Sequence, residues 1–198
     1  MATWASILIA IAVVIVVALV ALMAIRQRRT TTLRRRFGPE YERTVQERDG
    51  RRAGEADLLE RQKQRDRLEI KPLAEPARVR FAAEWREVQE RFVDEPSSAV
   101  VTADGLVYRV MEARGYPVDD FDGQANLISV DHPALVDNYR AAHDVCERAR
   151  SRQASTEDLR GALLHYRSLF DDLLEPADAD GADPGYGIDN HQSRRGVR

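Results

Sequence analysis

The sequence of 198 residues contains a single cysteine, Cys146, so an internal disulfide is excluded and a reducing compartment is expected. No stretch alternates apolar and polar residues over a useful length, so no β-sheet is expected. The phosphate-binding patterns G-x-x-x-x-G-K-[ST] and G-x-G-x-x-G are missing from the sequence, as are G-x-S-x-G and paired cysteines. An all-α protein that is not an enzyme and carries no cofactor or metal is therefore predicted.

One long apolar run stands out at the N-terminus, "WASILIAIAVVIVVALVALMAI", from Trp4 to Ile25. At about 1.5 Å per residue a helix of this length reaches roughly 30 Å, the thickness of a bilayer's hydrocarbon core. A cleaved signal peptide is the alternative, but that requires a basic start, a shorter core and a small-x-small cleavage site. Residues 1–25 are therefore predicted to form an uncleaved transmembrane anchor.

Six arginines follow the apolar run directly and none precedes it. Basic residues beside a membrane helix stay on the cytoplasmic side, which predicts an external N-terminus and a cytoplasmic C-terminal domain. Each arginine can also gain about 1 kcal/mol from anionic lipid. The basic arm lacks interleaved aromatic residues, so nucleic acid is not an expected partner. Residues 26–36 are interpreted as a juxtamembrane topology signal and lipid contact, made by Arg26, Arg28, Arg29, Arg34, Arg35 and Arg36.

Residues 37–71 are dense in charges of both signs, and the pattern predicts one long, solvated spacer helix. Gly50 and Gly54 each cost such a helix about 1 kcal/mol, and Arg48 and Arg52 fall on the apolar seam. Coiled-coil dimerisation, and with it a homo-oligomer, stays open as the alternative for this segment.

Residues 72–175 carry successive amphipathic stretches and predict a small helical bundle. Trp85 lies on an apolar stripe of the first bundle helix, and Gly115 is placed to end the second. Asp131 is expected to cap the helix that contains Cys146, and Ser155 has the spacing of a capping box. Residues 176–198 lack large apolar side chains and are predicted to be a disordered tail.

Two groups of residues were considered for function. His143 and Glu147 are one helical turn apart and suggest a metal-binding or enzymatic bundle, although the repeated Glu-x-x-His pattern of di-iron bundles is missing from the sequence. The second group mixes charged and aromatic side chains at helix ends, and predicts a surface for a protein partner. These residues are Arg114, Tyr116, Asp131 and His132; the alternative is that they only cap and stop helices.

Several strings, among them "RRRFGPEYERTV", "RGYPVDDFD" and "VDHPALVDNYRAAH", resemble a group of uncharacterised single-span membrane proteins of actinobacterial type. The resemblance covers roughly residues 34–174 and implies a helical cytoplasmic domain, but no activity and no site residues. The predicted function is thus a membrane-anchored, non-enzymatic scaffold for an unknown protein partner. An exported or secreted helical protein is the first alternative, and the metal-binding or enzymatic bundle is the second.

Overall fold

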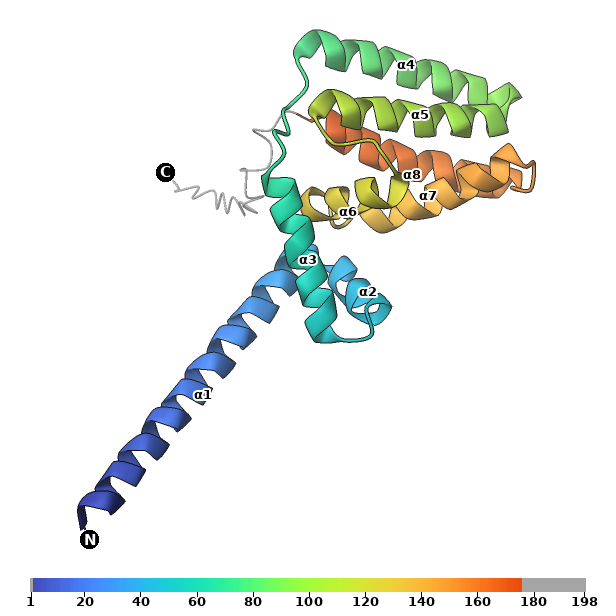
Figure 1. The fold of residues 1–198 in the computed structure, drawn as a ribbon. Helices are drawn as coiled ribbons and strands as arrows, with labels where there is room; N and C mark the ends of the chain where they lie inside the picture. The colour runs from blue at the N-terminus through green and yellow to red at the C-terminus, as the bar shows by residue number, and fades with distance from the viewer. Residues whose placement is uncertain (1, 176–198) are drawn as a thin grey trace, which may run out of the picture.

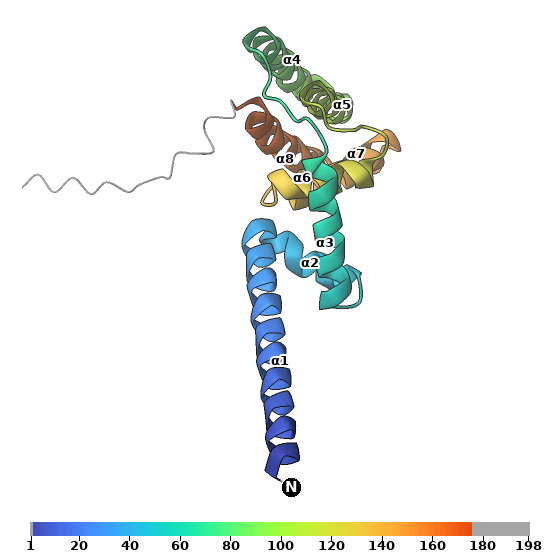
Figure 2. The same cartoon turned by 60° about the vertical axis from the view of Figure 1, so that its left-hand side comes forward.

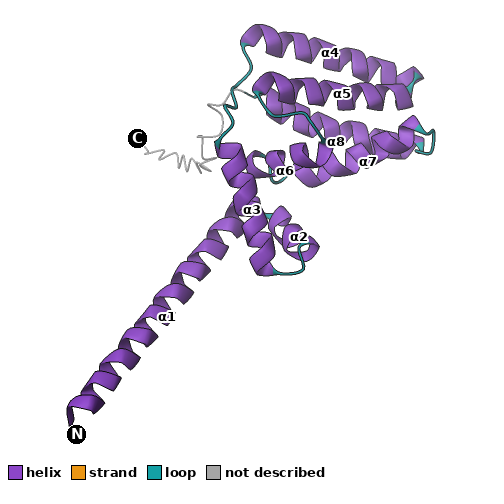
Figure 3. Cartoon of the chain, viewed as in Figure 1, coloured by secondary structure: helices purple, strands orange, loops and turns teal. Residues whose placement is uncertain are grey.

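A computed structural model describes residues 2–175, with side chains from residue 14 onward. These residues form eight α-helices and no strand, so the predicted all-α class is confirmed for the described part of the chain (Figures 1 and 3). The helices are α1 (Ala2–Phe37), α2 (Pro39–Glu47), α3 (Arg51–Asp66), α4 (Glu75–Asp94), α5 (Pro96–Arg114), α6 (Phe121–Asp131), α7 (Val136–Arg150) and α8 (Thr156–Leu174).

Helix α1 runs without a break through the apolar segment and the arginines, and it projects from the rest of the molecule in both views (Figures 1 and 2). From residue 14 onward, the packed part of α1 is its C-terminal end, where Leu33 and Phe37 are buried against α2, α3 and α6. In the part of the chain that the structure describes, no helix combines the length and hydropathy of a membrane span. Residues 4–13 of the predicted span lie outside the residues whose side chains are described.

The prediction of one continuous spacer helix over residues 37–71 is wrong, because this segment folds into the hairpin of α2 and α3. Gly50 adopts φ of 143°, a backbone conformation that other residues rarely take, and this lets the chain reverse direction directly before α3. Gly54 then lets the two helices touch, since an added Cβ would lie 2.8 Å from the Cα of Val45. The glycines that weaken a straight helix are therefore the residues that make the hairpin.

Helices α4 to α8 form the bundle around a single apolar core, with α5 packed against α4, α7 and α8. Trp85 is 4% exposed and stacks on Phe170 with ring centroids 4.7 Å apart, which confirms its predicted burial. The capping box is confirmed as well, because Ser155 Oγ accepts from the Asp158 amide at 3.1 Å and Asp158 accepts from the Ser155 amide. Gly115 ends α5 with φ of 100°, as predicted.

The predicted helix start at Asp131 is wrong by several residues. Asp120 caps α6 by accepting from the Gly123 amide at 2.7 Å, and the helix then continues to Asp131 as its last residue. Residues 132–135 form the connection, and α7 begins only at Val136. Asp131 and His132 therefore stand at the C-terminal end of α6, close to where the hairpin packs on the bundle.

Candidate functional site

A pocket of about 560 Å³ lies where the hairpin meets the bundle, a size typical of small-molecule sites. It is lined by residues at the ends of α1, α3, α5, α6 and α8 and in the segments that connect the helices. Its lining is rich in charge of both signs but includes an apolar strip. The charged and polar lining residues are Arg36, Arg65, Arg114, Tyr116, Asp131, His132, Asp172 and Glu175, and the apolar strip is Ile70, Pro72, Val130, Pro133, Ala134 and Leu135.

Asp131 is the lining residue with the most hydrogen bonds to other side chains of the pocket. Arg65 Nε donates to both of its carboxylate oxygens, at 2.7 and 2.8 Å, and Tyr116 Oη donates to Oδ2 at 2.6 Å. Burial and the nearby Asp131 charge raise the pKa of Tyr116, so its hydroxyl stays a hydrogen-bond donor. Burial alone would lower the pKa of Arg65, but the bond to Asp131 carries it above its usual value. The charge of Asp131 is therefore matched within the protein.

The lining residues Arg114, His132 and Asp172 are less completely bonded. Arg114 Nη1 donates to the carbonyl oxygen of Leu173 at 3.0 Å, which ties the end of α5 to the end of α8. His132 Nδ1 contacts the carboxylate of Asp172. Three buried polar atoms of these residues have no hydrogen-bond partner in the described structure: Arg114 Nε, His132 Nε2 and Asp172 Oδ2. This part of the lining therefore carries unused hydrogen-bonding capacity.

The four residues of the predicted partner surface all line this pocket. Arg114 and Tyr116 lie at the end of α5, and Asp131 and His132 lie at the end of α6. That they bind a partner stays a prediction. Of the six juxtamembrane arginines, only Arg36 joins them.

All six of these arginines are exposed along α1, Arg36 included. Arg34 is 3.0 Å from Glu42 and lies 5.1 Å above the ring of Tyr41, so it is partly occupied by the hairpin. The four others outside the pocket have no ion-pair partner among the described residues: Arg26, Arg28, Arg29 and Arg35. They are free to meet an external anionic surface.

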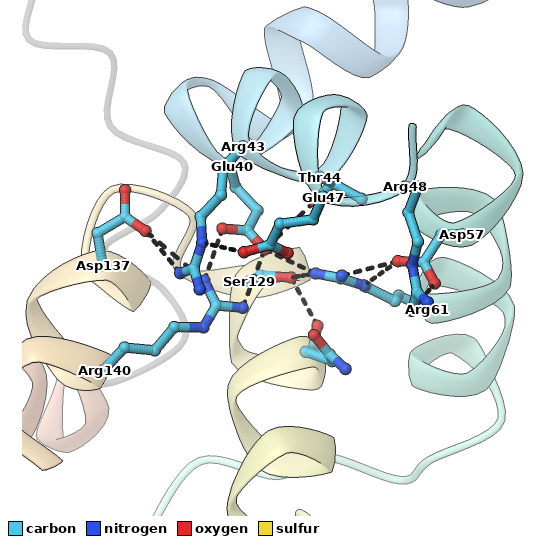
Figure 4. Close-up of polar contacts among 11 residues, drawn as sticks. Glu40, Arg43, Thr44, Glu47, Arg48, Asp57, Arg61, Ser129, Asp137 and Arg140 are labelled. Atoms are coloured by element: carbon cyan, nitrogen blue, oxygen red, sulfur yellow. Dashed lines mark hydrogen bonds and ion pairs between the residues drawn. The ribbon is translucent and has the colours of Figure 1, made fainter. Parts of the chain in front are cut away.

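A buried charge cluster holds the hairpin onto the bundle beside the pocket (Figure 4). Glu40 of α2 is fully buried and accepts from Arg61 of α3 at 2.6 Å and from Arg140 of α7 at 2.7 and 3.0 Å. Burial alone would raise the pKa of Glu40, but Arg140 and Arg61 lower it below its usual value, so the carboxylate stays ionised. Two guanidinium groups thus converge on one carboxylate.

Sequence patterns did not reveal this cluster. Glu40 sits in a run of charges that looks solvated, and its partners lie 21 and 100 residues away. The neighbouring pairs in Figure 4, such as Arg61 with Asp57 at 2.7 Å and Arg43 with Glu47 at 2.7 Å, are i,i+4 pairs that a helical pattern does show. A long-range pair leaves no periodic signal of this kind.

A second polar cluster surrounds Asp104 of α5. Its Oδ1 accepts from Tyr166 Oη at 2.7 Å and lies 3.3 Å from His143 Nδ1. Glu147 is 3.8 Å from His143 Nε2, but no group of three or more His, Cys, Asp or Glu residues within the described chain is placed to hold a metal ion. Burial and the Asp104 charge raise the pKa of Cys146 to about 11, so its thiol is protonated and a poor nucleophile.

No family model, curated protein or solved structure matches this chain. The resemblance to single-span membrane proteins of actinobacterial type therefore stays a prediction.

Proposed function

We propose that the protein is a membrane-anchored, non-enzymatic interaction module, with α1 inserted in the bilayer and the hairpin and bundle in the cytoplasm. One observation carries the proposal. The large apolar side chains of α1 between Val14 and Ile25 are 52% to 72% exposed, and they point in every direction around the helix. A helix that is apolar on all sides is stable only inside a protein core or a membrane.

The arginines that follow support both the depth and the orientation of this helix. A cytoplasmic location for basic flanking residues places Arg26, Arg28 and Arg29 at the lipid headgroups, each with about 1 kcal/mol to gain from anionic lipid. From residue 26 to Phe37 the helix rises about 16 Å, which holds the body clear of the membrane surface. The body is itself acidic, since Asp and Glu outnumber Lys and Arg in residues 37–175, so anionic lipid repels it.

The anchor is joined rigidly to the bundle, which favours a module that presents a surface at a fixed place. Leu33 and Phe37 of α1 pack with Tyr41 and Leu58 of the hairpin and Val130 of α6. The Glu40 cluster adds bonds from the hairpin to α7. These contacts also bury the apolar residues that a coiled coil between two chains would use. We therefore place partner binding at the pocket and its rim, and assign no cofactor.

Membrane insertion is tested by charging the apolar helix. The double variant Val16→Arg and Val20→Arg should move the full-length protein from the carbonate-resistant membrane fraction to the soluble or aggregated fraction, because an arginine near the centre of a membrane helix costs about 2.5–3.5 kcal/mol. The matched control is Val79→Arg and Val93→Arg, two exposed valines of α4. If both variants fractionate like the native protein, α1 does not insert.

Partner binding is tested separately by crosslinking in native membranes. The full-length protein should capture a defined protein, and Asp131→Asn or Arg65→Gln should lose it because they break the pocket wall. Glu87→Gln on the far α4 surface is the control. Binding would lie outside the pocket if all variants captured the partner equally, or if only the control variant Glu87→Gln lost it.

A further inference from the structure

The pocket between hairpin and bundle contains positive charge and hydrogen-bond donors that the protein does not use. Arg36 has no carboxylate within ion-pair distance among the described residues. Arg114 is bonded only to a backbone carbonyl, and its Nε is buried without a partner. Buried donors are rarely left unpaired in native proteins, since water or a ligand normally completes them.

The acidic residues of the pocket do not cancel this capacity. Asp131 is matched by Arg65 and Tyr116, and Asp172 lies against His132 Nδ1, although Asp172 Oδ2 makes no hydrogen bond among the described residues. Glu175 is exposed and lies at the last described position of the chain. His132 Nε2 is a second buried nitrogen of the lining that has no hydrogen-bond partner among the described residues.

The rest of the lining determines which anion fits. Ile70, Val130 and Leu135, with two prolines, give the pocket an apolar strip, and its volume of about 560 Å³ far exceeds the space that an inorganic ion fills. Arginine forks match the two oxygens of a carboxylate. We propose that this pocket binds a small organic carboxylate, with the carboxylate held by Arg36 and Arg114 and the apolar body on the Ile70 strip.

Such a ligand touches elements that the fold brings together from distant parts of the chain. Arg36 belongs to the anchor helix and Arg114 to the bundle, so a carboxylate held by both links the two. Binding therefore stabilises the docked hairpin, because a ligand that binds only the folded, docked state raises its stability. The pocket is the one to which partner binding is assigned above, but carboxylate binding is measured on the purified protein, so its outcome is independent of partner capture and of membrane insertion.

The test is calorimetric titration of the full-length protein in detergent micelles with four probes. N-acetyl-leucine and hexanoate carry one carboxylate and an apolar body, and N-acetyl-leucinamide keeps the body but lacks the charge. Inorganic phosphate supplies an anion without an apolar part. We expect both carboxylates to bind with a Kd below about 10 mM, and the other two probes to bind at least tenfold more weakly.

Matched variants locate the binding. Arg36→Gln should weaken the affinity for N-acetyl-leucine roughly tenfold. Arg35 is the adjacent exposed arginine outside the pocket, so Arg35→Gln should leave this affinity unchanged. Arg114→Gln should weaken the affinity for N-acetyl-leucine as well. If Arg114→Gln does not fold, the comparison of Arg36→Gln with Arg35→Gln decides the test. The proposal is overturned if neither carboxylate binds, if the amide or phosphate binds as well as the acid, or if Arg35→Gln and Arg36→Gln have equal effects.

Discussion

Replacing Glu40 with glutamine removes the shared carboxylate of the buried cluster and leaves Arg61 and Arg140 with one charge too many. The side chains of these arginines are 7% and 15% exposed, so water cannot make up the loss. Breaking a buried ion pair by removing one partner costs about 3–5 kcal/mol. Arg61 keeps Asp57 at 2.7 Å and Arg140 keeps Asp137 at 3.6 Å, so we expect a loss near 3 kcal/mol.

The assay is hydrogen exchange of the full-length protein followed by mass spectrometry. If the cluster holds the hairpin on the bundle, the amides of α2 and α3 should exchange roughly a hundredfold faster in Glu40→Gln, while those of α8 change much less. Glu47→Gln is the control, because Glu47 is an exposed partner of Arg43 and should change stability by less than about 1 kcal/mol. Equal exchange in the native protein and Glu40→Gln would refute the role given to the cluster.

A triple variant separates attraction from desolvation. Methionine at positions 40, 61 and 140 removes all three charges at once and leaves no buried ion without a partner. Replacing a complete buried ion cluster by apolar residues of similar volume is often neutral or stabilising. We therefore expect the triple variant to recover most of the protection that Glu40→Gln loses. A triple variant as unstable as the single one would mean that shape, and not charge balance, decides docking.

Three further outcomes follow from the same contacts. Glu40 and Asp104 have folded pKa values below their ordinary 4.5 and 3.8. Their contribution to stability is therefore present above the ordinary values and is lost as the pH falls through the lowered ones. The free energy of unfolding, measured as a function of acid pH, should show this loss, and Glu40→Gln should show less of it. Trp85→Ala should cost about 3–5 kcal/mol in denaturant unfolding, and an unchanged midpoint would mean that the stacked core position is not essential. Gly54→Ala should destabilise the hairpin by about 1–3 kcal/mol, whereas Gly161→Ala in open space should stabilise α8 slightly, and the reverse order in thermal melts would contradict the close packing of the hairpin.

Local signals predicted the bundle well. The apolar stripe that contains Trp85, the capping box at Ser155 and the stop at Gly115 all lie within a few residues of the structure that they determine, so the sequence displays them directly. Asp131 misled because an Asp before a helix and an Asp at the end of one look alike without knowledge of the cap at Asp120.

Long-range features were missed or only half seen. In the sequence, Gly50 and Gly54 indicate only a cost to a straight helix, since their role in the turn and the close packing appears only when α2 and α3 lie side by side. Glu40 looked solvated because Arg140 lies 100 residues away. Arg114 and His132 were chosen for their chemistry at helix ends, but nothing in the sequence shows that these ends meet at one pocket with Arg36.

The orientation of the anchored protein is measured most directly by protease protection of a C-terminal epitope tag in spheroplasts of the expression host. Permeabilised spheroplasts serve as the control for cleavage. The native tag should be protected if, as proposed, the arginines keep the residues after α1 on the cytoplasmic side. Replacing the six arginines by neutral glutamine should keep the protein in the membrane but give partial cleavage of the tag. The replaced residues are Arg26, Arg28, Arg29, Arg34, Arg35 and Arg36. A native tag that is cleaved from outside would mean that the bundle is exported, and would contradict a cytoplasmic interaction module.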